Sequence, residues 1–452
     1  MTEFSRRSFL HRSGAMFAAG ALVPAFCSRA LARGGISDPT KLRGYGPLVA
    51  DPAKLLDLPE GFRYRVLSRE GDALVGGGVV PACHDGMAAF SAGADGTWLV
   101  RNHELAVDDV NEEGRIAVPH LRGATYDPAA VGGTTTLLIA PDRTLRSQQV
   151  SLAGTLDNCA GGPSPWHTWL TCEETTDVLD KPHGYVFEVD PVRGGNPVPI
   201  RALGRFEHEA ISFDARGIAY LTEDAGGPFG CVYRFLPHRP LGGRGSLHAG
   251  GVLQAMAIDG VHDDLSSVLT PRTRRKVRWI DVPNVDPGAS DTPVRVQAIG
   301  KGATPIQKAE GTWRGLDGSI WLVSSYGAGP DAEDAEDISA AAHSGQIWRY
   351  DPRSEQIELV LALGVGSPYD GPDNITAGPY GFAVACTDGE GDQWLIGITP
   401  DGKVFPLARN ARGEDEFTGA TFSPDGRTLF ANLQDAPSTT FAIWGPWERG
   451  GR

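Results

Sequence analysis

The chain repeats a short pattern whose clearest copy is Asp95-Gly96-Thr97-Trp98-Leu99-Val100, a turn that leads into an apolar strand. An Asp-Gly pair favours a tight turn, and β-branched and aromatic residues favour an extended strand. Polar residues follow the apolar run. The other five copies lie at residues 166–171, 217–222, 317–322, 392–396 and 425–430.

A second apolar segment follows three of these copies, at residues 184–191, 230–235 and 345–352. We interpret each as the next strand of an antiparallel sheet. Helical periodicity is nearly absent, so the sequence predicts an all-β protein. Six irregular units that cannot bury their faces alone predict a six-bladed β-propeller with irregular insertions, formed as a single domain by residues 33–452. A pair of β-sandwiches is the alternative.

The first 32 residues are typical of a removable export leader. Arg6 and Arg7 precede an apolar stretch at residues 15–26, which is too short to span a bilayer. Small residues ahead of Arg33 predict cleavage near that position. The paired arginines predict export of the folded chain by the twin-arginine machinery, to the periplasm or the medium.

Charge and hydropathy exclude several kinds of partner. The formal net charge of the 452 residues is −15, and it becomes −18 without the leader, which holds four arginines and one glutamate. We therefore expect neither nucleic acid nor a membrane surface as a partner. Phe26 before Cys27 also disfavours a lipid anchor. A site of this charge that acts on anions would need bound cations, although a solvated acidic surface explains most of the carboxylates equally well.

The cysteines limit the chemistry of the exported chain. Because their number is odd in an oxidising compartment, at least one thiol must be buried, modified or bound to metal. A disulfide from Cys159 to Cys172 or Cys83 is an alternative, and Cys172 is more typical of a packed core thiol. The five cysteines beyond the leader are Cys83, Cys159, Cys172, Cys231 and Cys386.

A polar residue followed by a small one lies about ten residues before each repeated strand. Equivalent positions of propeller blades converge on the axis, so we predict a ring of carboxylates with one thiolate there. Such like charges are costly together unless cations bind between them. The six residues at this position are Asp85, Cys159, Glu209, Glu310, Tyr380 and Thr418.

A second acidic set follows the apolar strands of the first three copies. Carboxylate oxygens suit Ca²⁺, whereas a thiolate suits a transition metal such as iron or zinc, so together they predict a mixed-metal site. The alternative for residues 173–174 is an exposed turn. His103 and His208 either orient a neighbouring carboxylate or satisfy buried hydrogen bonds. The acidic residues of this set are Glu104, Glu173, Glu174, Glu223 and Asp224.

At these residues the chain resembles the PhoX-type alkaline phosphatases, a family of exported propellers with an iron and calcium cofactor. The resemblance covers roughly residues 40 to 440, and its most specific part is the block around Cys159. The matching segments are 102–104, 132–134, 158–162, 165–166, 168–174, 204–206, 208–210, 308–311 and 372–374.

The resemblance implies ligands for both metals. Those implied for iron (Fe³⁺) are Cys159, Glu209 and Glu310, and those implied for calcium (Ca²⁺) are Glu104, Glu174 and Asp373. Asp85, Glu173 and Asp224 are the remaining metal-ligand candidates from the repeat. In the family, the metals bind the phosphate ester and supply the nucleophile, so no serine nucleophile is needed.

Two features depart from the family. Lys308 stands where the phosphatases present an arginine that grips phosphate, and a lysine lacks the bidentate fork. The chain is also shorter, which leaves less sequence for loops over the substrate. We expect Lys308 and His208 beside the substrate, with Cys159, Glu209 and Glu310 as catalytic metal ligands.

The leading hypothesis is an exported, monomeric phosphatase that hydrolyses small phosphate esters. The first alternative is a calcium-dependent lactonase or esterase that holds one Ca²⁺ and leaves Cys159 without a role. The second is a non-catalytic binding propeller that needs calcium only for stability.

Overall fold

The computed structural model describes residues 42–333 and 337–449. These residues form antiparallel strands, and the α-helices between them, α3 (Val107–Asn111) and α4 (Val294–Ile299), are short. The all-β prediction is therefore confirmed. The predicted leader lies outside the described residues. Within them, we find no helix with the length and apolar character that a bilayer crossing requires.

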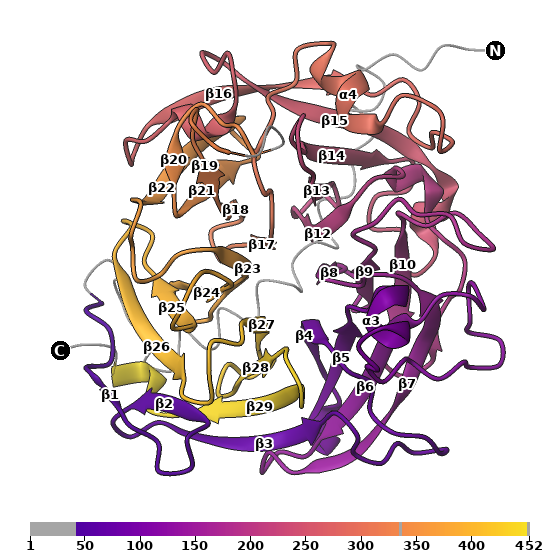
Figure 1. Ribbon diagram of the computed structural model, residues 1–452, viewed down its shortest axis with the longest axis vertical. Helices are drawn as coiled ribbons and strands as arrows, with labels where there is room; N and C mark the ends of the chain where they lie inside the picture. The colour runs from indigo at the N-terminus through magenta and orange to yellow at the C-terminus, as the bar shows by residue number, and fades with distance from the viewer. Residues whose placement is uncertain (1–41, 334–336, 450–452) are drawn as a thin grey trace.

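The sheets radiate from a common centre when the molecule is viewed along its shortest axis (Figure 1). Three sheets have four strands: β4 (His84–Ser91), β5 (Thr97–His103), β6 (Gly132–Ile139) and β7 (Leu145–Thr155); β8 (Gly161–Pro163), β9 (Trp169–Cys172), β10 (Val186–Asp190) and β11 (Gly194–Gly195); and β27 (Phe417–Phe422), β28 (Leu429–Leu433), β29 (Thr439–Trp444) and β3 (Arg63–Arg69). A six-stranded sheet contains β23 (Pro372–Ala377), β24 (Ala383–Thr387), β25 (Trp394–Ile398), β26 (Val404–Asn410), β2 (Leu56–Pro59) and β1 (Leu48–Val49). A nine-stranded sheet contains β12 (His208–Phe213), β13 (Ala219–Glu223), β14 (Val232–Pro237), β15 (Gly251–Ile258), β16 (Arg274–Asp281), β22 (Gln356–Leu363), β21 (Gly345–Asp351), β18 (Ile320–Ser324) and β17 (Thr312–Arg314). The last sheet pairs β19 (Gly327–Ala328) with β20 (Ala342–His343).

The inner strands form a closed circle. In order around the axis, β4 contacts β8, β8 contacts β12, β12 contacts β17, β17 contacts β23, β23 contacts β27, and β27 contacts β4. This circle is the arrangement of a propeller rather than of paired sandwiches. The count of six blades stays a prediction, because pairing of β16 with β22 joins the sheets of β12 and β17 into one.

The first and last parts of the described chain close the circle together. Strand β3 pairs with β29, so that Arg69 lies opposite Thr439 and Arg63 opposite Trp444. The contacts between sheets are apolar: Leu170 of β9 packs in one buried cluster with Ile211 of β12. A fully buried side chain of this kind contributes about 1.5–3 kcal/mol relative to exposure.

Irregular pairing recurs at one position of the inner strands. In four of them the register skips two residues, which bends the strand and turns a side chain toward a new direction. The skipped pairs are Asp85-Gly86 in β4, Glu209-Ala210 in β12, Asp373-Asn374 in β23 and Gly419-Ala420 in β27.

The fifth repeat copy does not form the second strand of its sheet, as the repeat predicts. Residues 392–396 form β25, the third strand of its sheet, whereas the second strand is β24. The inner strand of that sheet is β23, so Asp373 rather than Tyr380 holds the polar position. The pairing of β27 likewise puts Gly419, not Thr418, at the sixth position.

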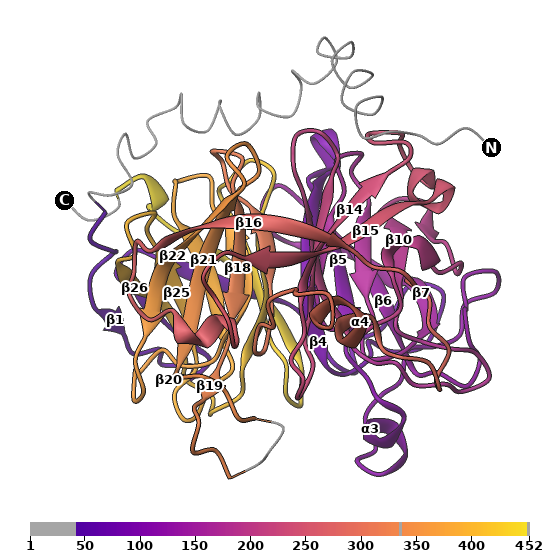
Figure 2. The same ribbon diagram turned by 90° about the horizontal axis from the view of Figure 1, so that it is seen from above.

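Two insertions project from the same side of the molecule, namely α3 and the β19–β20 hairpin (Figure 2). Helix α3 follows the end of β5, and the hairpin follows the end of β18. The ends of the second strands therefore mark the face that these insertions surround.

Close approach of neighbouring strands makes one glycine essential. A Cβ atom on Gly162 of β8 would lie 1.5 Å from the carbonyl oxygen of Ile211. We expect Gly162→Ala to lower the free energy of unfolding by about 3 kcal/mol, because the two sheets must move apart. Gly364→Ala is the matched control, since nothing lies within 4 Å of its Cβ position. Equal denaturant midpoints for the two variants would contradict this packing.

Candidate metal centre

The candidate site is built by the inner strands and by the residues just before two of them. Bulges supply Asp85, Glu209 and Asp373, and the segments immediately before β8 and β17 supply Cys159 and Glu310. Neighbouring strands are linked at this level: the Gly86 amide donates to the Cys159 carbonyl over 2.8 Å, and the Gly311 amide to the Asp373 carbonyl over 3.3 Å. The strand contacts therefore fix the spacing of the functional side chains.

Five side chains form two overlapping sets of potential metal ligands. Cys159, Glu174 and Glu209 offer one ligand atom each within 4.8 Å of one another, and so do Glu209, Glu310 and Asp373. Glu209 belongs to both. Cys159, Glu209 and Glu310 are buried, and the other two are partly buried. This partition differs from the one implied by the resemblance, because Glu174 rather than Glu310 accompanies the thiol.

A second tier lies at the ends of the second strands. The Gln434 amide donates to Glu104 over 2.6 Å and to Asp85 over 3.3 Å, which joins the two tiers. The Lys308 ammonium pairs with Asp224 and lies 3.4 Å from Glu310. Lys308 thus brings a positive charge against the cluster.

Burial and crowding raise the pKa values of the cluster. For Asp373, burial and then the neighbouring carboxylates Asp388 and Glu104 raise the pKa to about 8. Burial, followed by the charges of Glu209 and other acids, raises the pKa of the Cys159 thiol. Without cations, these groups retain protons to avoid repulsion. Burial first, and then nearby charges, also raise the pKa values of Asp85, Glu174, Glu209 and Glu310.

Several buried oxygens lack a partner within the described chain. Asp85 Oδ1, Glu209 Oε1 and Asp224 Oδ1 are inaccessible to solvent and accept no hydrogen bond. A buried carboxylate oxygen without a donor is costly, and a cation is the ligand that removes this cost. The donor set therefore fits bound cations, with oxygens for a hard ion and a thiol for a softer one.

All five described cysteines are free. The alternative of a disulfide from Cys159 to Cys172 or Cys83 is therefore wrong. The Cys159 sulfur lies 3.5 Å from the His208 carbonyl oxygen and 3.7 Å from that of Glu209. Its thiol thus faces the strand that carries the shared carboxylate.

Of the predicted residues outside the two ligand sets, Glu173 and His208 have side chains that are engaged elsewhere. Both oxygens of Glu173 accept hydrogen bonds from elsewhere, including one of 2.6 Å with His183. His208 is fully buried, stacks on Phe206 with ring centroids 3.6 Å apart, and uses Nε2 to bond the Gly204 carbonyl. Its ring is enclosed by these contacts, so we assign His208 no contact with a substrate.

Asp388 and Glu416 are two acids of the cluster that the repeat does not predict. Burial raises the pKa of Asp388 to about 6, and the charges of Glu104 and other acids add to this. Burial and the charges of Asp388 and Asp373 raise the pKa of Glu416. Asp388 follows β24 as Glu104 follows β5, so the correct register of the fifth unit would have revealed it.

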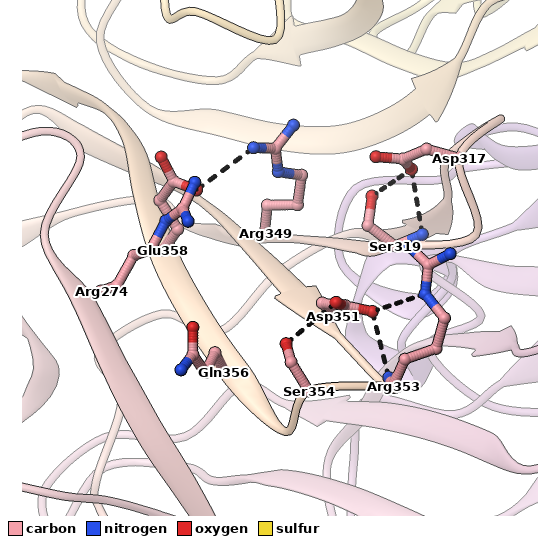
Figure 3. A pocket seen from close by; sticks show the side chains of 9 residues that line it. All are labelled: Arg274, Asp317, Ser319, Arg349, Asp351, Arg353, Ser354, Gln356 and Glu358. Atoms are coloured by element: carbon pink, nitrogen blue, oxygen red, sulfur yellow. Dashed lines mark hydrogen bonds and ion pairs between the residues drawn. The ribbon is translucent and has the colours of Figure 1, made fainter.

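Two pockets lie outside the ligand sets. The pocket in Figure 3 is on the outer strands, where Arg274 and Arg349 pair with Glu358 and Arg353 pairs with Asp351, so its cations are already engaged. A smaller pocket adjoins the cluster at Lys308. Its other lining residues are Ala225, Gly226, Phe229, Gln307, Tyr326, Ala328 and Asp337.

Comparisons with known proteins give one family and several remote structures. The family model described as alkaline phosphatase PhoX matches residues 43–146 and 140–437. No curated protein sequence matches the chain. A gluconolactonase from Xanthomonas campestris is 13% identical, with 89% of this chain and 99% of its own covered and a TM-score of 0.45. The calcium-binding protein regucalcin from Agrobacterium tumefaciens is 12% identical, with 84% and 96% covered and a TM-score of 0.40.

If this cluster binds Ca²⁺, the raised pKa values predict how that binding depends on pH. Carboxyl groups with raised pKa stabilise the metal-free fold at low pH, and this stability is lost as the pH rises toward the folded pKa, about 8 for Asp373. Calcium must displace these protons, so between about pH 5.5 and pH 7.5 its binding should strengthen by about 3 kcal/mol for each proton released.

Thermal unfolding with chelator or with Ca²⁺ measures this effect. We expect the calcium-induced rise in Tm to be larger at the higher pH and to shrink in Asp373→Asn. The rise in Tm caused by calcium could instead be the same at both pH values or unchanged in Asp373→Asn. Either result would contradict calcium binding by these carboxylates.

Proposed function

The chain belongs to the alkaline phosphatase PhoX family, and from this premise we propose that it hydrolyses phosphate esters at the two ligand sets that share Glu209. The observation that carries the proposal is this pair of adjacent sets, in which one buried thiol stands among carboxylates. A phosphoryl group carries negative charge, so a site this acidic can accept one only after cations have neutralised it.

We assign a transition metal, iron in our proposal, to Cys159, Glu174 and Glu209. Calcium would bind Glu209, Glu310 and Asp373, with further calcium ligands among the second-tier acids. When bound, such ions hold phosphoryl oxygens, stabilise the charge of the transferring group and activate the attacking water.

Lys308 would contact a phosphoryl oxygen of the substrate. The charge of Glu310, together with the ion pair to Asp224, raises the pKa of Lys308, so its ammonium stays protonated in alkaline solution. It acts as a point charge held by two cluster carboxylates, in place of a bidentate arginine.

The small pocket beside Lys308 would receive the organic part of a small ester. Its Phe229 and Tyr326 side chains and the small residues Ala225 and Ala328 form a partly apolar wall. Such a wall tolerates alcohol groups of different shape, whereas the phosphoryl group is held by charge.

We further propose that the protein works as a monomer in the periplasm or medium after twin-arginine export. Counting the nine-stranded sheet as two joined blades would give the six blades of the predicted propeller. Export of the folded chain would let the metals be inserted before secretion.

Metal analysis and an aryl phosphate assay on the same preparations test the proposal. Wild-type protein should contain iron and calcium and hydrolyse the ester. Cys159→Ser should lose at least about 100-fold in kcat, as expected when a ligand of the reacting centre is removed. Cys386→Ser is the control, because Cys386 is equally buried but lies in β24, outside both ligand sets.

The outcomes separate the alternatives. Full turnover by Cys159→Ser would refute the role of the thiol. Calcium alone, with hydrolysis of a lactone instead of the phosphate ester, would favour the calcium-dependent lactonase.

A further inference from the structure

Glu173 is fully buried and precedes Glu174 in the sequence. Unlike Glu174, it belongs to neither ligand set. Its Oε1 accepts from the Leu156 amide at 3.1 Å and lies 2.6 Å from His183 Nδ1. Its Oε2 accepts from the amides of Gly184 and Tyr185 at 2.9 and 3.0 Å. Four contacts fill the acceptor capacity of a carboxylate, so this side chain is a structural anchor.

The anchor connects to the first ligand set along the main chain. The Asp157 carbonyl accepts from the amides of both Cys159, at 3.1 Å, and Glu174, at 2.9 Å. Asp157 directly follows Leu156, whose amide Glu173 holds. The Glu173 carbonyl in turn accepts from the His208 amide at 2.9 Å, beside Glu209. Short stretches of hydrogen-bonded backbone thus connect Glu173 to each member of the Cys159, Glu174 and Glu209 set.

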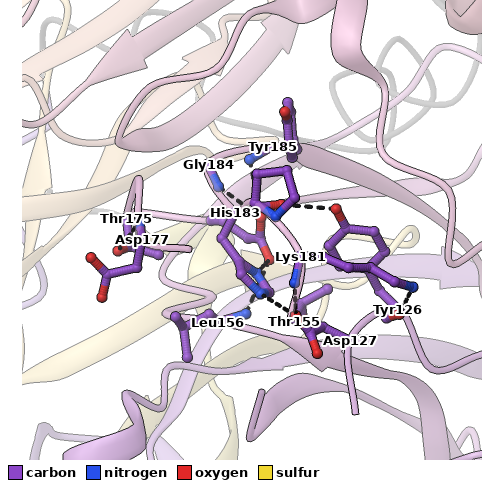
Figure 4. A network of polar contacts seen from close by, with 12 residues as sticks. Tyr126, Asp127, Thr155, Leu156, Thr175, Asp177, Lys181, His183, Gly184 and Tyr185 are labelled. Carbon is purple, nitrogen blue, oxygen red and sulfur yellow. Dashed lines mark hydrogen bonds and ion pairs between the residues drawn. The ribbon is translucent and has the colours of Figure 1, made fainter. Parts of the chain in front are cut away.

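His183 contacts this anchor and also lies beside a second buried acid, Asp127, which Figure 4 shows next to it. Its Nε2 lies 3.4 Å from Asp127 Oδ2, and all three side chains of the chain Asp127–His183–Glu173 are inaccessible to solvent. Asp127 is itself fixed, since it accepts from the Lys181 and Ala129 amides at 2.6 and 2.9 Å. Burial alone would lower the pKa of His183, but its bonds to the two carboxylates raise it.

We propose that Asp127, His183 and Glu173 are positioning residues that set the metal affinity of the Cys159, Glu174 and Glu209 set. The inference rests on the proposed function, because it requires that this set bind a metal. Residues that fix ligands from behind typically change metal affinity 10–100-fold when they are altered, without touching the metal. Within the described chain, no side-chain hydrogen bond of these three residues reaches Glu310 or Asp373, so the second set should respond less.

A matched glutamate separates positioning from general stability. Glu188 of β10 lies in the same sheet, is also buried, and accepts from Trp166, Thr168 and the Gly245 amide. Its contacts lead away from the ligand sets. Glu188→Gln therefore tests what the loss of one buried carboxylate does to the fold alone.

The experiment is a Co²⁺ titration of metal-free full-length chain, followed by thiolate-to-cobalt charge-transfer absorption, which reports binding at Cys159. Calcium affinity is measured on the same variants by calorimetry. We expect Glu173→Gln to lower the affinity for Co²⁺ about 10–100-fold. The affinity for Ca²⁺ should fall less than about threefold. Glu188→Gln should leave both near wild type.

His183→Asn is the second variant, in case Glu173→Gln does not fold. It can keep the donor to Glu173 but loses the link to Asp127, so we expect an intermediate loss of cobalt affinity. Wild-type cobalt affinity in both folded variants, or an equal loss in Glu188→Gln, would overturn the inference. Absence of any charge-transfer band in the wild-type chain would instead refute the proposed metal centre itself.

Discussion

Mutual repulsion between carboxylates at the centre of the ring is the constraint on which the rest of this structure depends. Asp85, Glu209 and Glu310 are buried, and their pKa values are raised first by that burial and then by the charges of neighbouring acids, among which Asp373 acts on all three. The Lys308 ammonium meets only part of this charge. Cations that bind such a cluster stabilise the folded chain. The ions that relieve the repulsion between the carboxylates would be the same ions that we propose for catalysis.

The fold supplies the cluster by bringing separate strands to one axis. Five of the six inner strands contribute one side chain, at a bulge or just before the strand begins, and the sixth, β27, has Gly419 there. A small residue beside the functional one lets the next strand approach closely, as Gly86 does against Cys159. Ligands far apart in sequence are then held by rigid elements rather than by flexible loops. The buried Glu173 adds a further support behind the thiol, which is how metal sites commonly fix ligand geometry.

Much of the carboxylate ring could be predicted from the sequence. Asp85, Cys159, Glu209 and Glu310 each lie about ten residues before a repeated strand, and this spacing can be recognised in the sequence alone. The fifth unit could not, since residues 392–396 imitate the repeat yet form a third strand. Adjacent acids posed a different difficulty. Which of Glu173 and Glu174 faces the centre depends on strand register, and that is set by pairing partners that the local sequence does not reveal.

The most direct test of the central claim is anomalous diffraction from crystals of protein loaded with iron and calcium. Two ions flanking Glu209 are predicted, with iron bonded to the sulfur of Cys159 and calcium on the side of Glu310 and Asp373. A single ion at this centre, or an iron peak that is not bonded to Cys159, would contradict the account.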